Sequence, residues 1–71
     1  MAPLTRGVIT AFDAEAGLGS VRADGGQLYP FHCTQIADGS RQIDEAAKVE
    51  FEVVAGHGGQ WEAAALRPCG G

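Results

Sequence analysis

Aromatic side chains are scarce in this 71-residue chain, which has three phenylalanines, one tyrosine and one tryptophan. Positive charge is also scarce, since five basic residues stand against nine acidic ones and the net charge is −4. Proteins that bind single-stranded nucleic acid usually combine stacking aromatics with cations that neutralise phosphates. The composition therefore argues against a strong, non-specific hold on nucleic acid. The basic residues are scattered along the sequence, so we expect few of them to face one site: Arg6, Arg22, Arg41, Lys48 and Arg67.

The chain also lacks long hydrophobic runs and has few cysteines. No apolar run approaches the roughly 20 residues of a membrane-spanning helix, and no signal segment opens the chain, so we expect a soluble, cytoplasmic protein without a membrane partner. Cys33 and Cys69 are too few for a disulfide framework. Together with His32 and His57 they lack any known zinc-ligand spacing, so we expect no metal. No nucleophile–base–carboxylate set and no phosphate loop is visible, so we expect no enzyme, cofactor or small-molecule substrate.

The sequence does contain the alternation of apolar and polar side chains that is typical of β-strands. Strands are predicted over residues 7–13, 18–23, 27–33, 48–56 and 61–66, with a short helix as the alternative for the alanine-rich last segment. Asp24-Gly25 predicts a hairpin turn. Pro30 cannot donate to a ladder, so it predicts an edge or a bulge in the third strand.

The connection over residues 34–47 is long and carries a second turn signal at Asp38-Gly39. Ile36 and Ile43 within it are expected to reach the core. Five short strands with a long link after the third predict an all-β fold, a five-stranded antiparallel OB-fold barrel. A β-grasp fold would need a long amphipathic helix in the middle, and residues 44–48 supply only a fragment of one.

The inward phase of the alternation predicts which side chains form the core. We expect a mostly buried set that consists of Ile9, Val21, Tyr29, Phe31, Ile36, Val49, Phe51 and Val53. The expected domain layout is an N-terminal tail at 1–5, an OB domain at 6–67 and a flexible C-terminal tail at 68–71.

Several short motifs follow one another at definite spacings: Gly7, Phe12-Asp13, Gly17-x-Gly19, Asp24-Gly25, Phe31-His32, Ile36, Glu45, Val49-x-Phe51-x-Val53, Gly56 and Gly59. In their order and spacing, residues 6–66 resemble the bacterial cold-shock domain. The resemblance implies a five-stranded OB barrel that binds single-stranded RNA and DNA.

Most stacking positions of that family hold other residues here. The first ribonucleoprotein motif, Lys-Gly-Phe-Gly-Phe-Ile in the family, is AGLGSV at 16–21, and the second, Val-Phe-Val-His-Phe, is YPFHC at 29–33. Five stacking positions are thereby lost, at Ala11, Leu18, Ser20, Pro30 and Cys33. At ~1 kcal/mol for each stacked base, the loss is about 5 kcal/mol, or more than three decades of affinity. We therefore expect any nucleic-acid binding to be weak.

The resemblance leaves a reduced binding face with six candidate residues: Phe12, Leu18, Ser20, Arg22, His32 and Trp61. His32 alone matches a binding position of the family outright. Phe12 is also interpreted as a packing residue. Trp61 has two interpretations, a relocated stacking platform at the rim of the face or a large side chain that fills space beside the alanine-rich last strand.

Two further functions remain as alternatives. A protein-interaction module on the same scaffold would use the apolar patch formed by Ala11, Leu18, Pro30 and Cys33. A carrier of the ubiquitin or sulfur-carrier kind is suggested only by the terminal Gly70-Gly71. The predicted strand order does not suit the β-grasp fold of such carriers.

Overall fold

The structure, a computed structural model, describes residues 4–37 and 43–69, except the side chain of His57. The described residues form five strands and no α-helix: β1 (Leu4–Asp13), β2 (Leu18–Ala23), β3 (Leu28–His32), β4 (Lys48–Ala55) and β5 (Trp61–Pro68). Two short 3₁₀ helices, η1 (Cys33–Gln35) and η2 (His57–Gly59), follow β3 and β4. All five predicted strands are present, and the last is a strand rather than a helix. The expected Asp38-Gly39 turn and the Gly70-Gly71 tail lie outside the described residues.

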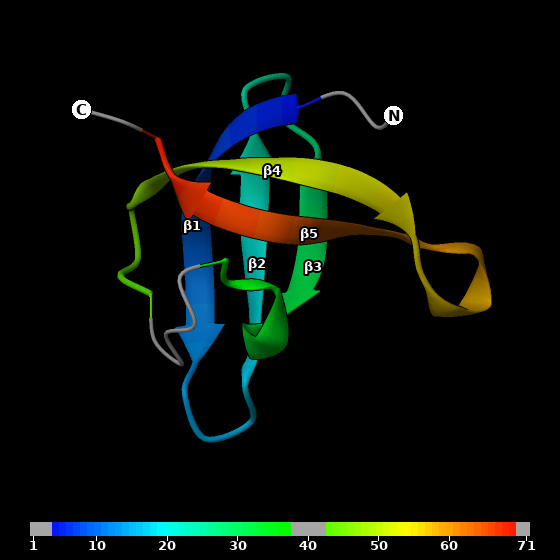
Figure 1. The fold of residues 1–71 in the computed structure, drawn as a ribbon, viewed down its shortest axis with the longest axis horizontal. Coiled ribbons are helices and arrows are strands. Elements are labelled where there is room, and N and C mark those ends of the chain that lie inside the picture. Colours follow the sequence, from blue (N-terminus) through cyan, green and yellow to red (C-terminus); the bar gives the residue numbers. More distant parts are fainter. Residues whose placement is uncertain (1–3, 38–42, 70–71) are drawn as a thin grey trace.

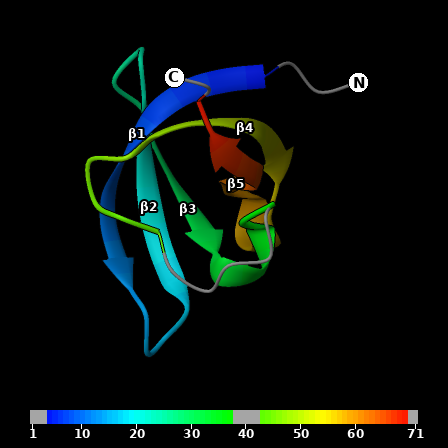
Figure 2. The ribbon, with the colours of Figure 1, turned by 60° about the vertical axis from the view of Figure 1, so that its left-hand side comes forward.

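The strands form one antiparallel sheet in the order β3-β2-β1-β4-β5. In Figure 1 the β1–β2–β3 layer lies behind, and the β4–β5 hairpin crosses in front of it. Figure 2 shows the same two layers from the side, curled around a common interior. Pro30 lies in β3, at one edge of the sheet, where the proline removes no hydrogen bond from an interior ladder. The edge position predicted from its sequence is confirmed.

The two edges of the sheet, β3 and β5, meet through the segment after β3 and not through a ladder of their own. Ile36 makes an isolated parallel bridge with Leu66, and the Ala37 N–H donates to the Leu66 carbonyl at 2.6 Å. The sheet is therefore a small OB-type barrel that its hydrogen bonds do not close. None of the helices in the described part of the chain is long and apolar enough to cross a membrane.

Strand β1 belongs to both layers, because its pairing register shifts near the middle of the strand. Its register with β2 shifts between Ile9 and Ala11, and its first half pairs with β4. Around the shift, the Ile9 N–H donates to the Ala47 carbonyl at 3.0 Å and the Ala46 N–H to the Ile9 carbonyl at 2.7 Å. A bulge of this kind bends and twists a strand. The bend lets β1 pass from the first layer to the second.

The core lies between the two layers and consists of Ile9, Val21, Ala23, Phe31, Ile36, Val49, Phe51, Ala63 and Leu66. Most of the predicted core is confirmed, and Ile43 packs half-buried against it. Tyr29 and Val53 are corrections, because both are only half-buried. They line a groove at one end of the barrel together with Gln27 and Trp61, where the two layers no longer cover each other.

Candidate nucleic-acid interface

The outer surface of β2 and β3 brings most of the candidate residues together. The antiparallel register pairs Leu18 with His32, Ser20 with Pro30, and Arg22 with Leu28. Alternate residues point inward, so Val21 and Phe31 are buried while these six lie on the outer side. We call the six, together with Ala11 beside Ser20 on β1, the three-strand face. Four of the six predicted site residues lie on it: Leu18, Ser20, Arg22 and His32.

The centre of this face is polar. The hydroxyls of Thr10 and Ser20 lie 2.8 Å apart, and the Thr10 hydroxyl also donates to the Ser20 carbonyl at 3.3 Å. The resemblance places a stacking phenylalanine of the family at Ser20. Here the two hydroxyls bond to each other, so this part of the face offers hydrogen bonds to a ligand but no ring to stack on.

His32 lies at the end of the three-strand face with its ring held in place. Its Nδ1 accepts a hydrogen bond from the Thr34 backbone N–H at 3.2 Å and so caps η1. The Thr34 hydroxyl lies 3.1 Å from the same nitrogen. Because Nδ1 is an acceptor, the neutral ring carries its proton on Nε2. The exposed ring therefore presents an oriented donor to a base or a phosphate oxygen.

Phe12 differs from the other candidates because it belongs largely to the interior. It is half-buried, and its ring lies parallel to that of Phe31 with centroids 6.0 Å apart. This contact supports the interpretation of Phe12 as a packing residue.

Trp61 begins β5 and is 59% exposed. Its ring does not fill the core beside the alanine-rich strand, which the sequence left as one interpretation. It lines a groove with Leu28, Tyr29 and Pro30 of β3 and with two amide side chains, Gln27 and Gln60. Trp61 therefore lies at the rim of the three-strand face, next to its Leu28 end.

The charges around the face are unequal at its two ends. Arg22, opposite Leu28, is the one basic side chain that the described residues contribute to this face. At the other end Asp13 pairs with Leu18, and Glu62 borders a hollow that Leu18, Pro30 and His32 also line. Carboxylates beside a phosphate chain oppose its binding. The Arg22 end is therefore the favourable one for a nucleic acid.

Leu28 and Thr10 are part of this surface although the sequence did not single them out. Leu28 is exposed. Its outward position could have been read from the phase that it shares with Pro30 and His32. Among the residues that the structure describes, no three His, Cys, Asp or Glu side chains gather as a metal site, and Cys33 and Cys69 are free thiols.

Residues 5–68, nearly the whole chain, match the family model described as the 'Cold-shock' DNA-binding domain. This domain is a nucleic-acid-binding fold and not a known family of enzymes. No curated protein matches the sequence at a significant level.

Proposed function

Because the chain belongs to the cold-shock domain family, a family of nucleic-acid-binding domains, we propose that it binds single-stranded RNA or DNA weakly through the three-strand face. The observation that carries the proposal is the β2–β3 register, which sets Leu18, Ser20 and Arg22 opposite His32, Pro30 and Leu28 on one exposed surface. In this proposal His32 donates hydrogen bonds from Nε2, Arg22 contacts phosphate, and Trp61 stacks a base at the rim. The proposed function is binding alone, without a catalytic role.

The proposed affinity is weaker than micromolar at physiological salt. Trp61 is the one exposed large aromatic in the described part of the chain, whereas each stacked base is worth ~1–3 kcal/mol. The three-strand face itself offers a single basic side chain, Arg22, and an acidic border near His32. A strand held by this face alone would release few counterions, so log K would fall by only ~0.7 per decade of salt concentration.

Titration with oligo-dT and oligo-U at low salt tests the proposal. Bound single strands should quench or shift the Trp61 fluorescence and should perturb the backbone amide signals of Leu18, Ser20 and His32. A duplex of the same length serves as the control, because its bases are not free to stack. Amide and fluorescence signals that do not respond to either oligonucleotide would overturn the proposal.

A protein partner is the second candidate, favoured by the apolar side chains that the same surface exposes. Leu18, Leu28 and Trp61 are each more than half exposed, and the neighbouring carboxylates of Asp13 and Glu62 suit a basic partner. If oligonucleotides leave the three-strand face unperturbed while a basic peptide perturbs it, this second function replaces the first. Cytoplasmic localisation stays a prediction from the sequence.

A further inference from the structure

Four of the five basic residues come together on the surface that adjoins the three-strand face. In the sheet register Val8 of β1 lies between Arg22 of β2 and Lys48 of β4. Two residues further along β4, Glu50 lies between Arg6 of β1 and Arg67 of β5 on the same outer side of the sheet. We call Arg6, Arg22, Lys48 and Arg67 the basic strip. All four side chains are exposed, and they come from four neighbouring strands.

The charges of the strip are spaced as separate contacts. Neighbouring strands lie ~4.8 Å apart, so Arg22 and Lys48, one strand removed from each other, are about 10 Å apart along the sheet. This separation slightly exceeds the Debye length of ~8 Å at physiological ionic strength, so each cation acts as its own contact for a phosphate. The strip begins at Arg22, which is also a member of the three-strand face.

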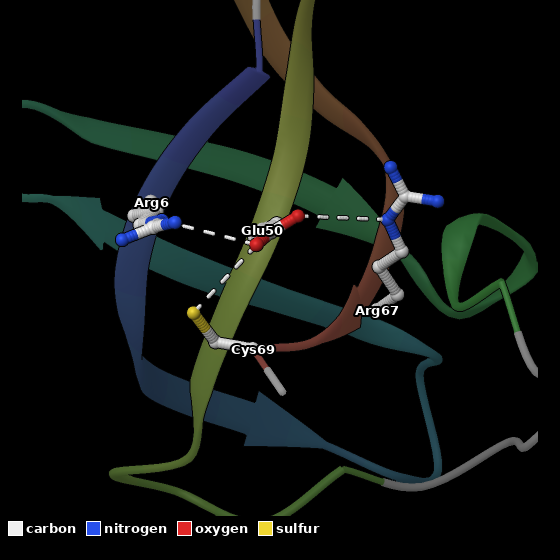
Figure 3. Close-up of polar contacts among 4 residues, drawn as sticks. All are labelled: Arg6, Glu50, Arg67 and Cys69. Carbon is white, nitrogen blue, oxygen red and sulfur yellow. Dashed lines mark hydrogen bonds and ion pairs between the residues drawn. The ribbon is translucent and has the colours of Figure 1, made fainter. Parts of the chain in front are cut away.

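Glu50 orders two of the arginines without using all their donors. Its carboxylate oxygens lie 3.8 Å from Nε of Arg6 and 3.8 Å from Nε of Arg67. Figure 3 shows the carboxylate between the two guanidinium groups, with the terminal nitrogens of Arg67 directed away from it. One carboxylate faces two guanidinium groups, so this row keeps a net positive charge. The outward nitrogens are suited to bidentate contacts with phosphate oxygens.

Acidic groups also border the strip and limit its strength. Asp24 lines a shallow hollow together with Arg6, Lys48 and Cys69. Glu52 is the next outward residue of β4 after Glu50. The four cations still outnumber the three neighbouring carboxylates, Glu50, Glu52 and Asp24, and the acids at the His32 end of the three-strand face lie beyond the strip. The positive surface therefore continues from Arg22 across β1 and does not follow the three-strand face toward His32.

We propose that the sugar–phosphate chain of a bound single strand continues from Arg22 across β1 onto the basic strip, where it contacts Lys48, Arg6 and Arg67. The inference rests on the proposed function for its ligand and adds a second surface to it. Recognition on the strip is by phosphate charge and is independent of base sequence. The bases of this part of the strand face solvent.

Salt dependence distinguishes the strip from the three-strand face alone. Four phosphate contacts give a slope of ~2.8 in log K against log salt, and one contact gives ~0.7. Between 50 and 200 mM salt, binding of oligo-dT should therefore weaken about 50-fold with the strip engaged and about threefold without it. In the Lys48→Gln/Arg67→Gln variant the weakening should drop to about sevenfold, because two contacts are lost.

A control variant separates the strip from a general effect of net charge. Ala14→Glu/Ala16→Glu changes the net charge by the same amount at exposed positions between β1 and β2, at the far end of β2 from Arg22, and should keep the wild-type slope. Asp24→Asn should strengthen binding at low salt. Equal slopes of log K against log salt in the wild type and the Lys48→Gln/Arg67→Gln variant would overturn the inference. If oligo-dT still quenches the Trp61 fluorescence in that case, the proposed function is retained.

Inorganic polyphosphate, a phosphate chain without bases, tests the strip independently of base stacking. It should shift the amide signals of Val8, Lys48 and Arg67 in the wild type and shift them less in the double variant, which keeps Arg6 and Arg22. If polyphosphate does so while oligo-dT and oligo-U leave Trp61 unchanged, the strip is supported as a phosphate-binding surface and the three-strand face is not. If polyphosphate perturbs none of the three amides, the strip is overturned.

Discussion

The rings of Phe12 and Phe31 lie nearly parallel, at 8°, with their centroids 6.0 Å apart, and Gly19 makes room for Phe31. A Cβ atom on Gly19 would lie 2.6 Å from Cζ of Phe31 and 2.8 Å from the Ala11 carbonyl oxygen. The second glycine of Gly17-x-Gly19 thus has a packing role whatever the protein binds. The motif persists here although the stacking residues around it are gone.

Gly19→Ala should therefore destabilise the fold. The added methyl group must displace a ring or a backbone carbonyl, and overpacking of this kind costs ~1–3 kcal/mol. For a chain of this size the melting temperature should fall by about 4 °C or more, as measured by thermal unfolding. Gly25→Ala is the matched control, because a Cβ atom there meets nothing within 4 Å. An equal loss in both variants would contradict the role assigned to Gly19.

Leu18→Phe should restore part of the lost affinity. Leu18 is 54% exposed and lies opposite His32, so a phenyl ring there can stack a base without disturbing the core. A gain of ~1–3 kcal/mol per stacked base corresponds to roughly 5- to 150-fold tighter binding of oligo-dT. The same substitution at Leu4, which is 53% exposed outside the three-strand face, should leave the dissociation constant unchanged. A gain of equal size at Leu4 would indicate non-specific hydrophobic attraction.

Trp61→Ala and His32→Ala should each weaken binding of single strands by about 1 kcal/mol or more, measured by titration at low salt. Because Trp61 is exposed, we expect the melting temperature to change little in Trp61→Ala, whereas His32→Ala also removes the side-chain cap of η1 and should lower it. A Trp61→Ala variant with normal binding and a much lower melting temperature would assign the tryptophan a structural role. The nucleic-acid proposal would then lose its one stacking ring.

Leu66→Ala should be far more damaging to the fold than Leu28→Ala. Leu66 is fully buried between the layers whereas Leu28 is exposed, and truncation of a buried leucine costs about 2–5 kcal/mol. Chemical denaturation should show this loss for Leu66→Ala and almost none for Leu28→Ala. Comparable losses of unfolding free energy in the two variants would mean that Leu66 does not point into the core.

The local sequence was enough to predict the strands and most of the core. Apolar residues at alternate positions, such as Val49 and Phe51 in β4, point to one side of a strand whatever its partner is. The turn at Asp24-Gly25 and the edge position of Pro30 also depend on backbone preferences of single residues. These features are local, so they can be read from neighbouring residues alone.

The end of β5 shows where alternation fails. Ala63 and Leu66 are both buried although they are three residues apart, because Ala65 adopts a positive φ of 54° and the register with β4 shifts there. The extra residue changes the phase of the strand. An alanine gives no signal of this in the sequence, since its side chain favours neither the bulge nor a regular strand.

The sequence by itself determined the all-β class, the inward phase of most strands and the scarcity of stacking rings. Only the tertiary structure decided that Trp61 lies exposed at the rim, that Tyr29 and Val53 reach the open end of the barrel, and that the scattered cations form a strip. Arg6, Lys48 and Arg67 come from distant parts of the chain and meet through the register of β1, β4 and β5. Register depends on the packing of whole strands against one another and on bulges within them, so the spacing of charges along the chain does not reveal which of them share a surface.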